Sequence, residues 1–239
     1  MRGRIERILD YARTHGWRDG ENPARWRGHI QNILPKPSSI ASVEHYAAPN
    51  REDMPGIMRA LLASEGLAAK AVAFTCLTAM RSGEIRQAAW SEIDVQSRVW
   101  HAPTEHMKGK KEHRVPLSDS ALEILKAVRP LRNPAHGDLV FPGQKQGKPL
   151  SDVALSKALH QAARTKAVTV HGLRSTFRDW AAEETDYPNE VAEMALAHVI
   201  GNKVEAAYRR GDLFEKRRQM MDDWAAFVTS RQPQASGEQ

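Results

Sequence analysis

The sequence predicts an α+β protein that is mainly helical, with a small antiparallel sheet packed beside the helices. Over most of the chain, apolar residues recur three and four positions apart, which is typical of helices that bury one face. Between residues 98 and 117, short runs of strand-like residues flank a polar turn. Hydrophobic residues make up 41% of the 239 residues, which is enough for a buried core.

The apolar spacing predicts where the helices lie. They are expected at residues 4–15, 54–62, 67–79, 84–89, 118–128, 151–162, 171–181, 191–196 and 213–228, with a further short helix that carries Tyr208 and stops at Gly211. Ser151 is the expected N-cap of its helix, because a serine side chain can accept a hydrogen bond from a free N–H of the first turn. Ser82-Gly83 breaks the pattern between two of these helices.

Three short segments favour strands, at residues 98–101, 104–107 and 113–117. The polar run Lys108-Gly-Lys-Lys111 between the last two predicts a hairpin turn. Residues 130–150 are rich in Pro, Gly and Lys and are expected to form a loop.

The first 45 residues differ from the rest of the chain. Asn22-Pro23 breaks any helix, and residues 24–50 contain several prolines and serines, which indicates a linker. About forty residues are too few for an independent core. This segment is therefore either an appendage docked on the main domain or the end of a larger domain.

Charge narrows the classes of function. The formal net charge is +6 and the pI is near 9.5, which favours a polyanionic partner such as nucleic acid, although a basic protein without such a partner is an equal alternative on charge alone. The single cysteine, Cys76, excludes an internal disulfide and a Cys-rich zinc site. No apolar run is long enough to cross a bilayer, and the charged N-terminus does not resemble a signal peptide, so we expect a cytoplasmic protein.

His171 and Arg174 are the first candidates for chemistry. They lie three residues apart at the start of the helix expected at 171–181, so both are expected on its first exposed turn. Free N–H groups and the positive end of the helix dipole also lie there. An imidazole and a guanidinium at such a place can bind a phosphate and move a proton beside it.

Four further features have both a chemical and an ordinary structural interpretation. In Arg81-Ser-Gly-Glu84 the carboxylate can brace the guanidinium, or the pair is a surface salt bridge. Lys108 can reach into a groove, or is simply solvated. His198 follows an apolar stripe, where most histidines pack or cap a helix. Tyr208 precedes two arginines, and most such tyrosines pack an amphipathic helix.

The order of these residues resembles the catalytic domain of the tyrosine recombinase (phage integrase) family, from about residue 51 to residue 229. Three stretches resemble the integrases of satellite prophages and genomic islands in particular: Asn22-Pro-Ala-Arg-Trp-Arg-Gly-His29, His45-Tyr-Ala-Ala, and Ala207-Tyr-Arg-Arg leading into Glu215-Lys-Arg-Arg-Gln-Met-Met-Asp-Asp-Trp224. The resemblance implies a tyrosine recombinase catalytic domain at residues 46–230. It also implies the end of a helical core-binding domain with its linker at residues 1–45, and a polar tail at residues 231–239.

The resemblance also implies a role for each residue. Tyr208 would attack a DNA phosphate and form a 3′-phosphotyrosyl bond, which releases a 5′-hydroxyl. Arg81, Arg174 and His198 would hold the non-bridging oxygens. His171 would act as acid and base near the tyrosine proton, Lys108 as general acid for the 5′ oxygen, and Glu84 as support. No metal or other cofactor is implied, and the chain contains no Gly-rich phosphate loop.

As partners, the resemblance implies double-stranded DNA attachment sites at the nucleoid, a homo-tetramer of the full-length protein on DNA, and accessory DNA-bending and directionality proteins, with no membrane. The last helix, through Trp224 and Phe227, would pack either on a neighbouring protomer or on its own domain. Ala197 stands where many relatives have glycine. A truncated DNA-binding remnant without recombination activity is the main alternative; a type IB topoisomerase and an RNA-binding protein are less favoured.

Overall fold

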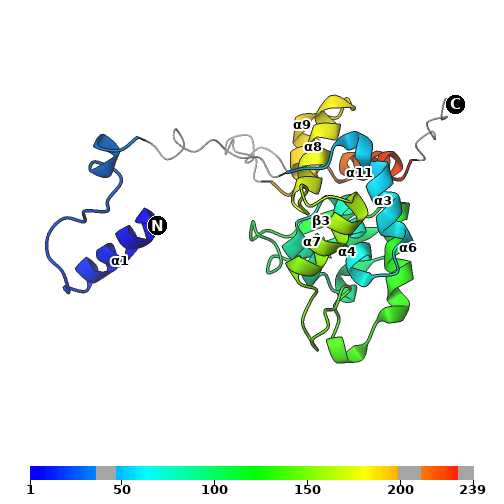
Figure 1. Cartoon of the computed structure of the whole chain (residues 1–239), viewed down its shortest axis with the longest axis horizontal. Coiled ribbons are helices and arrows are strands. Elements are labelled where there is room, and N and C mark those ends of the chain that lie inside the picture. Colours follow the sequence, from blue (N-terminus) through cyan, green and yellow to red (C-terminus); the bar gives the residue numbers. More distant parts are fainter. Residues whose placement is uncertain (36–46, 199–210, 231–239) are drawn as a thin grey trace. The chain divides into compact units, whose positions relative to one another are not determined.

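The computed structural model describes residues 1–35, 47–198 and 211–230. The chain divides into two compact units, Met1–His45 and Tyr46–Gln239 (Figure 1). The first unit contains helix α1 (Arg2–Thr14) and the 3-10 turn η1 (Ile30–Asn32). No residue of α1 is buried, and Ile8 is 66% exposed, so apolar packing contributes little within this unit. Polar contacts hold its loop instead: the Asn22 amide donates to Glu6 O (2.8 Å) and to Asp10 Oδ1 (2.6 Å).

The second unit contains all the other helices and strands that the structure describes. In chain order they are η2 (Arg51–Asp53), α3 (Met54–Ala63), α4 (Leu67–Thr78), α5 (Ser82–Gln87), η3 (Trp90–Glu92), β1 (Ile93–Asp94), β2 (Val99–Ala102), β3 (His113–Pro116), α6 (Asp119–Val128), η4 (Arg129–Leu131), η5 (Pro134–His136), α7 (Asp152–Ala163), α8 (Gly172–Glu183), α9 (Asn189–Ala195) and α11 (Phe214–Thr229). This mainly helical α+β architecture confirms the predicted fold class.

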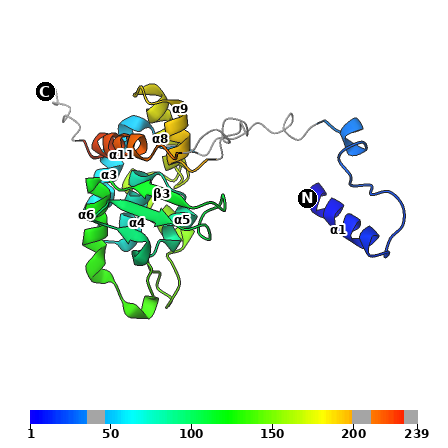
Figure 2. The same ribbon diagram turned by 180° about the vertical axis from the view of Figure 1, so that it is seen from behind.

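Helix α4 lies at the centre of this unit. It packs against α3, α5, α6, α7, α8 and α11, and nine of its twelve residues are buried. A helix that is apolar on nearly every side is stable only when neighbours surround it, which agrees with the composition of this segment. Figures 1 and 2 both show α8, α9 and α11 gathered at one end of the unit, and the loop after α6 at the opposite end.

The sheet has three antiparallel strands in the order β1-β2-β3, with Trp100 paired to both Ile93 and Val115. The prediction of a strand at residues 104–107 is wrong. Pro103 has no N–H with which to extend the ladder, and the chain turns there through hydrogen bonds from His106 N to Pro103 O (3.1 Å) and from Met107 N to Thr104 O (3.3 Å). Strand β1 was not predicted, because a strand of two residues shows no alternation.

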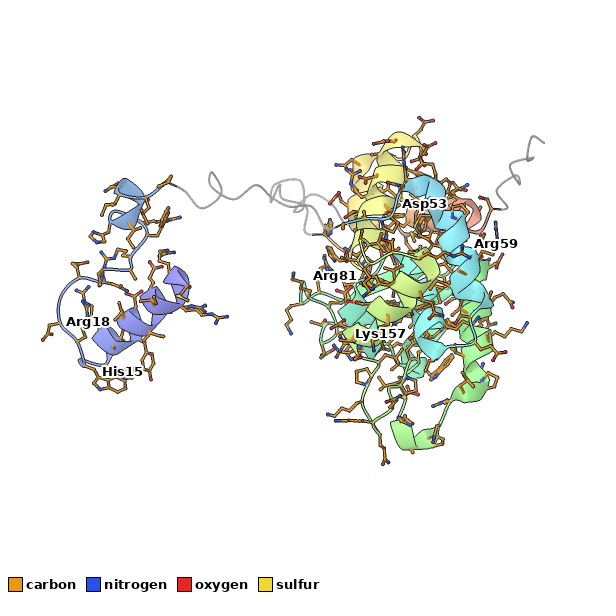
Figure 3. All side chains as sticks on the ribbon, in the orientation of Figure 1. His15, Arg18, Asp53, Arg59, Arg81 and Lys157 are labelled. Carbon is orange, nitrogen blue, oxygen red and sulfur yellow. The ribbon has the colours of Figure 1, made fainter. Side chains whose placement is uncertain are left out.

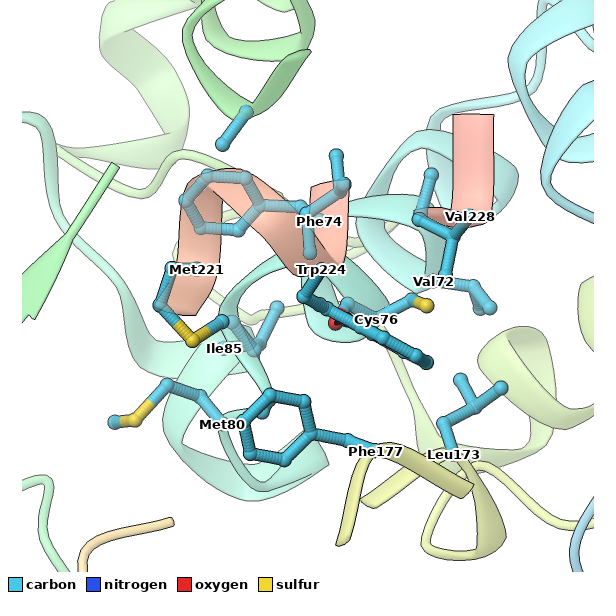
Figure 4. Close-up of a cluster of buried hydrophobic side chains, with 14 of the residues drawn as sticks. Val72, Phe74, Cys76, Met80, Ile85, Leu173, Phe177, Met221, Trp224 and Val228 are labelled. Carbon is cyan, nitrogen blue, oxygen red and sulfur yellow. Dashed lines mark hydrogen bonds between the residues drawn. The ribbon is translucent and has the colours of Figure 1, made fainter. Parts of the chain in front are cut away.

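Helix α11 packs within its own chain, against α3, α4, α9 and β3. Trp224 is fully buried, and its indole N–H donates to Cys76 O over 2.8 Å. Its ring meets Phe177 of α8 edge-on, with 5.4 Å between the ring centroids (Figure 4). This aromatic contact joins the last helix to α8, which carries Arg174 and is preceded by His171.

Local signals explain where several helices begin. Ser118 and Ser151 each accept a hydrogen bond from the backbone N–H three residues later, which confirms the N-cap predicted at Ser151. Helix α5 begins at Ser82, two residues earlier than predicted. The preceding helix α4 already ends at its C-cap residue Ala79, whose φ is +51°, and not at Ser82-Gly83. No helix in the three described stretches is both long and apolar enough to cross a membrane.

Candidate active site

Arg174 lies between the C-terminal ends of two helices. Its Nη1 donates to Ala79 O at the end of α4, and its Nη2 donates to Leu196 O at the end of α9 over 2.7 Å. Helix C-termini carry partial negative charge, so both carbonyls stabilise the cation. The expectation of an exposed Arg174 is wrong, because the residue is only 3% exposed. Burial and the nearby charge of Arg81 lower the pKa of Arg174 to about 10, so it remains charged at neutral pH.

Arg81, labelled in Figure 3, is the N-cap residue of α5 and follows the end of α4. Glu84 contacts it there through its carboxylate. Glu84 Oε2 accepts from Arg81 N and Oε1 from Arg81 Nη1, both over 3.0 Å. Oε1 also accepts from Lys108 N in the β2–β3 connection over 3.4 Å. The Glu84 carboxylate is 2% exposed, so this contact is a buried brace and not a surface salt bridge. One carboxylate therefore positions both the guanidinium and the loop on which Lys108 lies.

His198 completes the surroundings of Arg174. Its Nε2 lies 3.1 Å from Arg174 Nη2, and its Nδ1 lies 2.8 Å from Glu193 Oε2. The chain reaches this position through Ala197, whose φ of +48° lies in the left-handed region that glycine adopts more easily than alanine. Glycine would therefore adopt this backbone conformation with less strain than Ala197 does.

His171 precedes α8 as its N-cap residue, and its side chain is exposed. Partial burial lowers the pKa of His171, and the positive charges of Arg174, Arg81, Lys108 and His198 lower it further. The charges of these four residues thus all reach His171 at the start of α8. Hydrogen bonds also link Arg174 to His198, and join Arg81 and the backbone of Lys108 to the same carboxylate. A cluster of positive charge with a neutral imidazole in it can bind an anion and accept a proton beside it.

Tyr208 lies outside the described residues, but the chain on its C-terminal side is firmly held. Asp212 receives hydrogen bonds from Arg114 (2.7 and 3.0 Å) and from Arg217 Nη2 (2.8 Å). Arg217, which is fully buried, also donates to Asp212 O and to Arg114 O, each over 2.7 Å. These contacts tie the start of α11 to β3. The charges of both Asp212 and Arg174 act on the pKa of His113, which is next to Arg114. His113 therefore links this anchor to the cationic cluster.

Sequence reasoning missed Glu193, Arg178, Asp212, Arg114 and Arg217. Glu193 and His198 are five residues apart, a spacing that does not bring side chains together on a regular helix. They meet because α9 ends at Ala195 and the chain then turns. Asp212 and Arg114 are 98 positions apart in the sequence, a separation for which no local pattern exists.

The described residues contain no group of three or more His, Cys, Asp or Glu side chains that could hold a metal ion. Arginine, lysine and histidine donors are the groups that converge on the site instead.

The comparisons with known proteins agree on one family. The model of the phage integrase family matches residues 43–213. Prophage integrase IntA of Escherichia coli (strain K12) is 35% identical over 236 residues, which cover 94% of this chain and 52% of IntA. The chain spans about half the length of the curated relatives that it matches.

Solved structures show the same fold at low sequence identity. The Tn1549 transposon integrase in complex with circular intermediate DNA gives a TM-score of 0.59 at 14% identity, with 92% of this chain and 76% of that chain covered. The lambda integrase tetramer bound to a Holliday junction gives a TM-score of 0.56 at 17% identity, with 88% of this chain and 58% of that chain covered.

Proposed function

Because the chain belongs to the phage integrase family, we propose that it is a site-specific recombinase that integrates and excises a mobile element by cutting and rejoining DNA strands. The observation that carries this proposal is the convergence of Arg81, Arg174, His171, His198 and Lys108 around the start of α8. Such a cluster suits a phosphodiester, whose charge grows on the non-bridging oxygens in the transition state.

Two guanidiniums and an imidazole are suited to hold those oxygens. Arg174 is rigid, since backbone carbonyls from two helices position its guanidinium. Arg81 is oriented by Glu84, and 20% of its side chain remains exposed, which leaves it accessible to a ligand. His198, beside Arg174, supplies a third donor when its Nε2 carries a proton. Donors that are held before the substrate arrives lower the barrier most effectively, because they need no reorganisation during the reaction.

The chemistry that we propose has two steps. The Tyr208 oxygen attacks the phosphorus while its proton passes to a base, and a 3′-phosphotyrosyl bond forms. The 5′ oxygen leaves with a proton from the Lys108 ammonium. The lowered pKa of His171 favours a neutral imidazole that can accept the tyrosine proton. In rejoining, a 5′-hydroxyl attacks the phosphotyrosyl bond and the Tyr208 oxygen leaves, which reverses both steps. Cationic side chains stabilise the charge on the phosphate oxygens without a metal ion.

The anchor at Asp212 supports Tyr208 as the nucleophile. Tyr208 stands four positions before Asp212, so a fully extended chain spans at most about 14 Å between their Cα atoms. Asp212 is tied to β3 next to His113, and the charge of Arg174 acts on His113, which supports a tyrosine four positions before Asp212 as a group of the same site.

The same proposal extends to domains and partners. Residues 46–230 form the catalytic domain, residues 1–45 the end of a core-binding domain with its linker, and residues 231–239 a polar tail. The substrates are double-stranded attachment sites at the nucleoid in the cytoplasm. The full-length protein acts as a homo-tetramer, as the lambda integrase tetramer on a Holliday junction does. DNA-bending and directionality proteins assist it.

Covalent trapping tests the proposal. The chain is incubated with a nicked attachment-site duplex from the flanks of the source element, with excess chelator and without nucleotide. We expect a protein–DNA adduct that resists denaturation, and none with Tyr208→Phe, which keeps the ring but lacks the attacking oxygen. Arg174→Lys keeps the charge but loses the planar fork, so its adduct forms more slowly. Binding of the duplex without any adduct would overturn the proposal in favour of a DNA-binding remnant.

A further inference from the structure

The geometry points to Glu193 as a positioning residue: we propose that its carboxylate holds His198 with the Nδ1 hydrogen toward α9 and Nε2 toward the phosphate site, so that His198 becomes a phosphate donor only by taking up a proton. This inference rests on the proposed function for the identity of the ligand. Its structural part, the position of the imidazole hydrogen, can be tested without any reaction.

The contacts of Glu193 are specific. Its Oε2 lies 2.8 Å from His198 Nδ1, and its Oε1 accepts from Arg178 Nε over 2.7 Å. The backbone repeats the link, since His198 N donates to Glu193 O over 2.9 Å. Partial burial raises the pKa of the Glu193 carboxyl, but the hydrogen bonds from His198 and Arg178 outweigh it and lower the pKa overall. Glu193 is therefore an anion that only accepts hydrogen bonds at neutral pH.

Two independent contacts select the same tautomer of His198. A carboxylate beside Nδ1 requires the hydrogen on Nδ1. Arg174 Nη2, which can only donate, lies 3.1 Å from Nε2, and this contact is favourable only when Nε2 carries a lone pair. In the DNA-free protein, neutral His198 thus donates to Glu193 and accepts from Arg174.

A phosphate oxygen reverses the requirement at Nε2. A lone pair on Nε2 repels the oxygen, so His198 can hold a phosphate only after Nε2 gains a proton from solvent. The Arg174 N–H that pointed at Nε2 then also becomes available to the phosphate. Among the residues that the structure describes, the charged and titratable groups that face His198 are Arg174 from α8, His171 at the start of α8, and Glu193 from α9. Glu193 is the anion among these groups, and its carboxylate contacts the imidazole directly.

The pH dependence of adduct formation distinguishes this role from a merely structural one. In single-turnover trapping between pH 6 and pH 9, we expect the alkaline fall in rate to occur about one pH unit lower for Glu193→Gln than for wild type, because the opposite charge is lost. The rates then differ roughly tenfold at high pH and converge at low pH. Asp179→Asn, which removes an exposed carboxylate of α8, should follow the wild-type profile. Equal slowing at every pH by Glu193→Gln would overturn the proposal.

Nitrogen NMR of the whole chain with ¹⁵N-labelled imidazoles gives the second readout. The His198→Asn spectrum identifies the His198 signals by their loss. At pH 8 we expect His198 of the wild type without DNA to be the Nδ1–H tautomer. The Nε2–H tautomer of His198, or an equal mixture of the two, would refute the inference whether or not an adduct forms. Absence of an adduct in the wild type, by contrast, counts against the proposed function and leaves the NMR result to judge Glu193.

Discussion

Gly172, the first residue of α8, offers the sharpest test of how the site is built. A Cβ at this position would lie 2.8 Å from Ala48 Cα and closer still to the Ala47 carbonyl oxygen. The optimal separation of two carbon atoms is about 3.5–4.0 Å, so the two backbones would have to separate by roughly 1 Å. Neither can yield easily, because Ala47 O accepts from Thr169 N over 2.9 Å and Pro49 O accepts from Thr176 Oγ1 over 2.7 Å.

Gly172→Ala should therefore lower the free energy of unfolding by about 1–3 kcal/mol, the usual cost of overpacking. It should also shift the two residues of the site on either side, His171 and Arg174. A displacement of about 1 Å can reduce a rate roughly 100-fold, so adduct formation should fall more steeply than stability. Urea unfolding followed by tryptophan fluorescence measures the first effect, and covalent trapping measures the second.

Gly56→Ala is the matched control. Gly56 is an exposed residue of α3, and a Cβ there meets nothing within 4 Å. Alanine is better than glycine within a helix by about 0.5–1 kcal/mol, so this variant should be more stable than wild type, with the same adduct yield. If Gly172→Ala were as stable as Gly56→Ala, the close approach of the two backbones would not be what positions α8.

Two further predictions concern the anchor beside Tyr208. Arg217→Met should lower the free energy of unfolding by about 3 kcal/mol in urea, because it removes the three hydrogen bonds that this fully buried side chain donates to Asp212 O, Asp212 Oδ2 and Arg114 O. Arg217→Lys should not restore the loss, since lysine lacks the fork of N–H groups. Full rescue by lysine would show that charge alone matters. Burial and the charge of Arg217 lower the pKa of His113 from 6.5 to about 3, so the native imidazole stays neutral where the unfolded one is protonated. The contribution of His113 to the free energy of unfolding is complete above pH 6.5 and is lost toward pH 3, by up to about 1.4 kcal/mol per pH unit. In urea unfolding, the free energy of unfolding should fall less between pH 7 and pH 5 for His113→Gln than for wild type. Equal falls would contradict the assignment.

The sequence by itself determined the helical framework and the positions of the candidate residues. Apolar spacing located the helices because burial of one face repeats every three or four residues, a property that is local to each segment. The order Arg81, Glu84, Lys108, His171, Arg174, His198 and Tyr208 indicated the family, which the match over residues 43–213 shows. The roles of these residues remain proposals.

Only the tertiary structure decided how the cations are held. Arg174 looked like an exposed residue of a first turn, but the ends of α4 and α9 meet its guanidinium and bury it. Glu193 and Asp212 carried no signal in the sequence, because each acts through partners that a turn or a distant strand brings close. Strand β1 could not be predicted, because two residues are too few to show the alternation of buried and exposed side chains. A local pattern encodes which face of a segment is buried, whereas the packing of the whole chain decides which carbonyl or carboxylate meets that face.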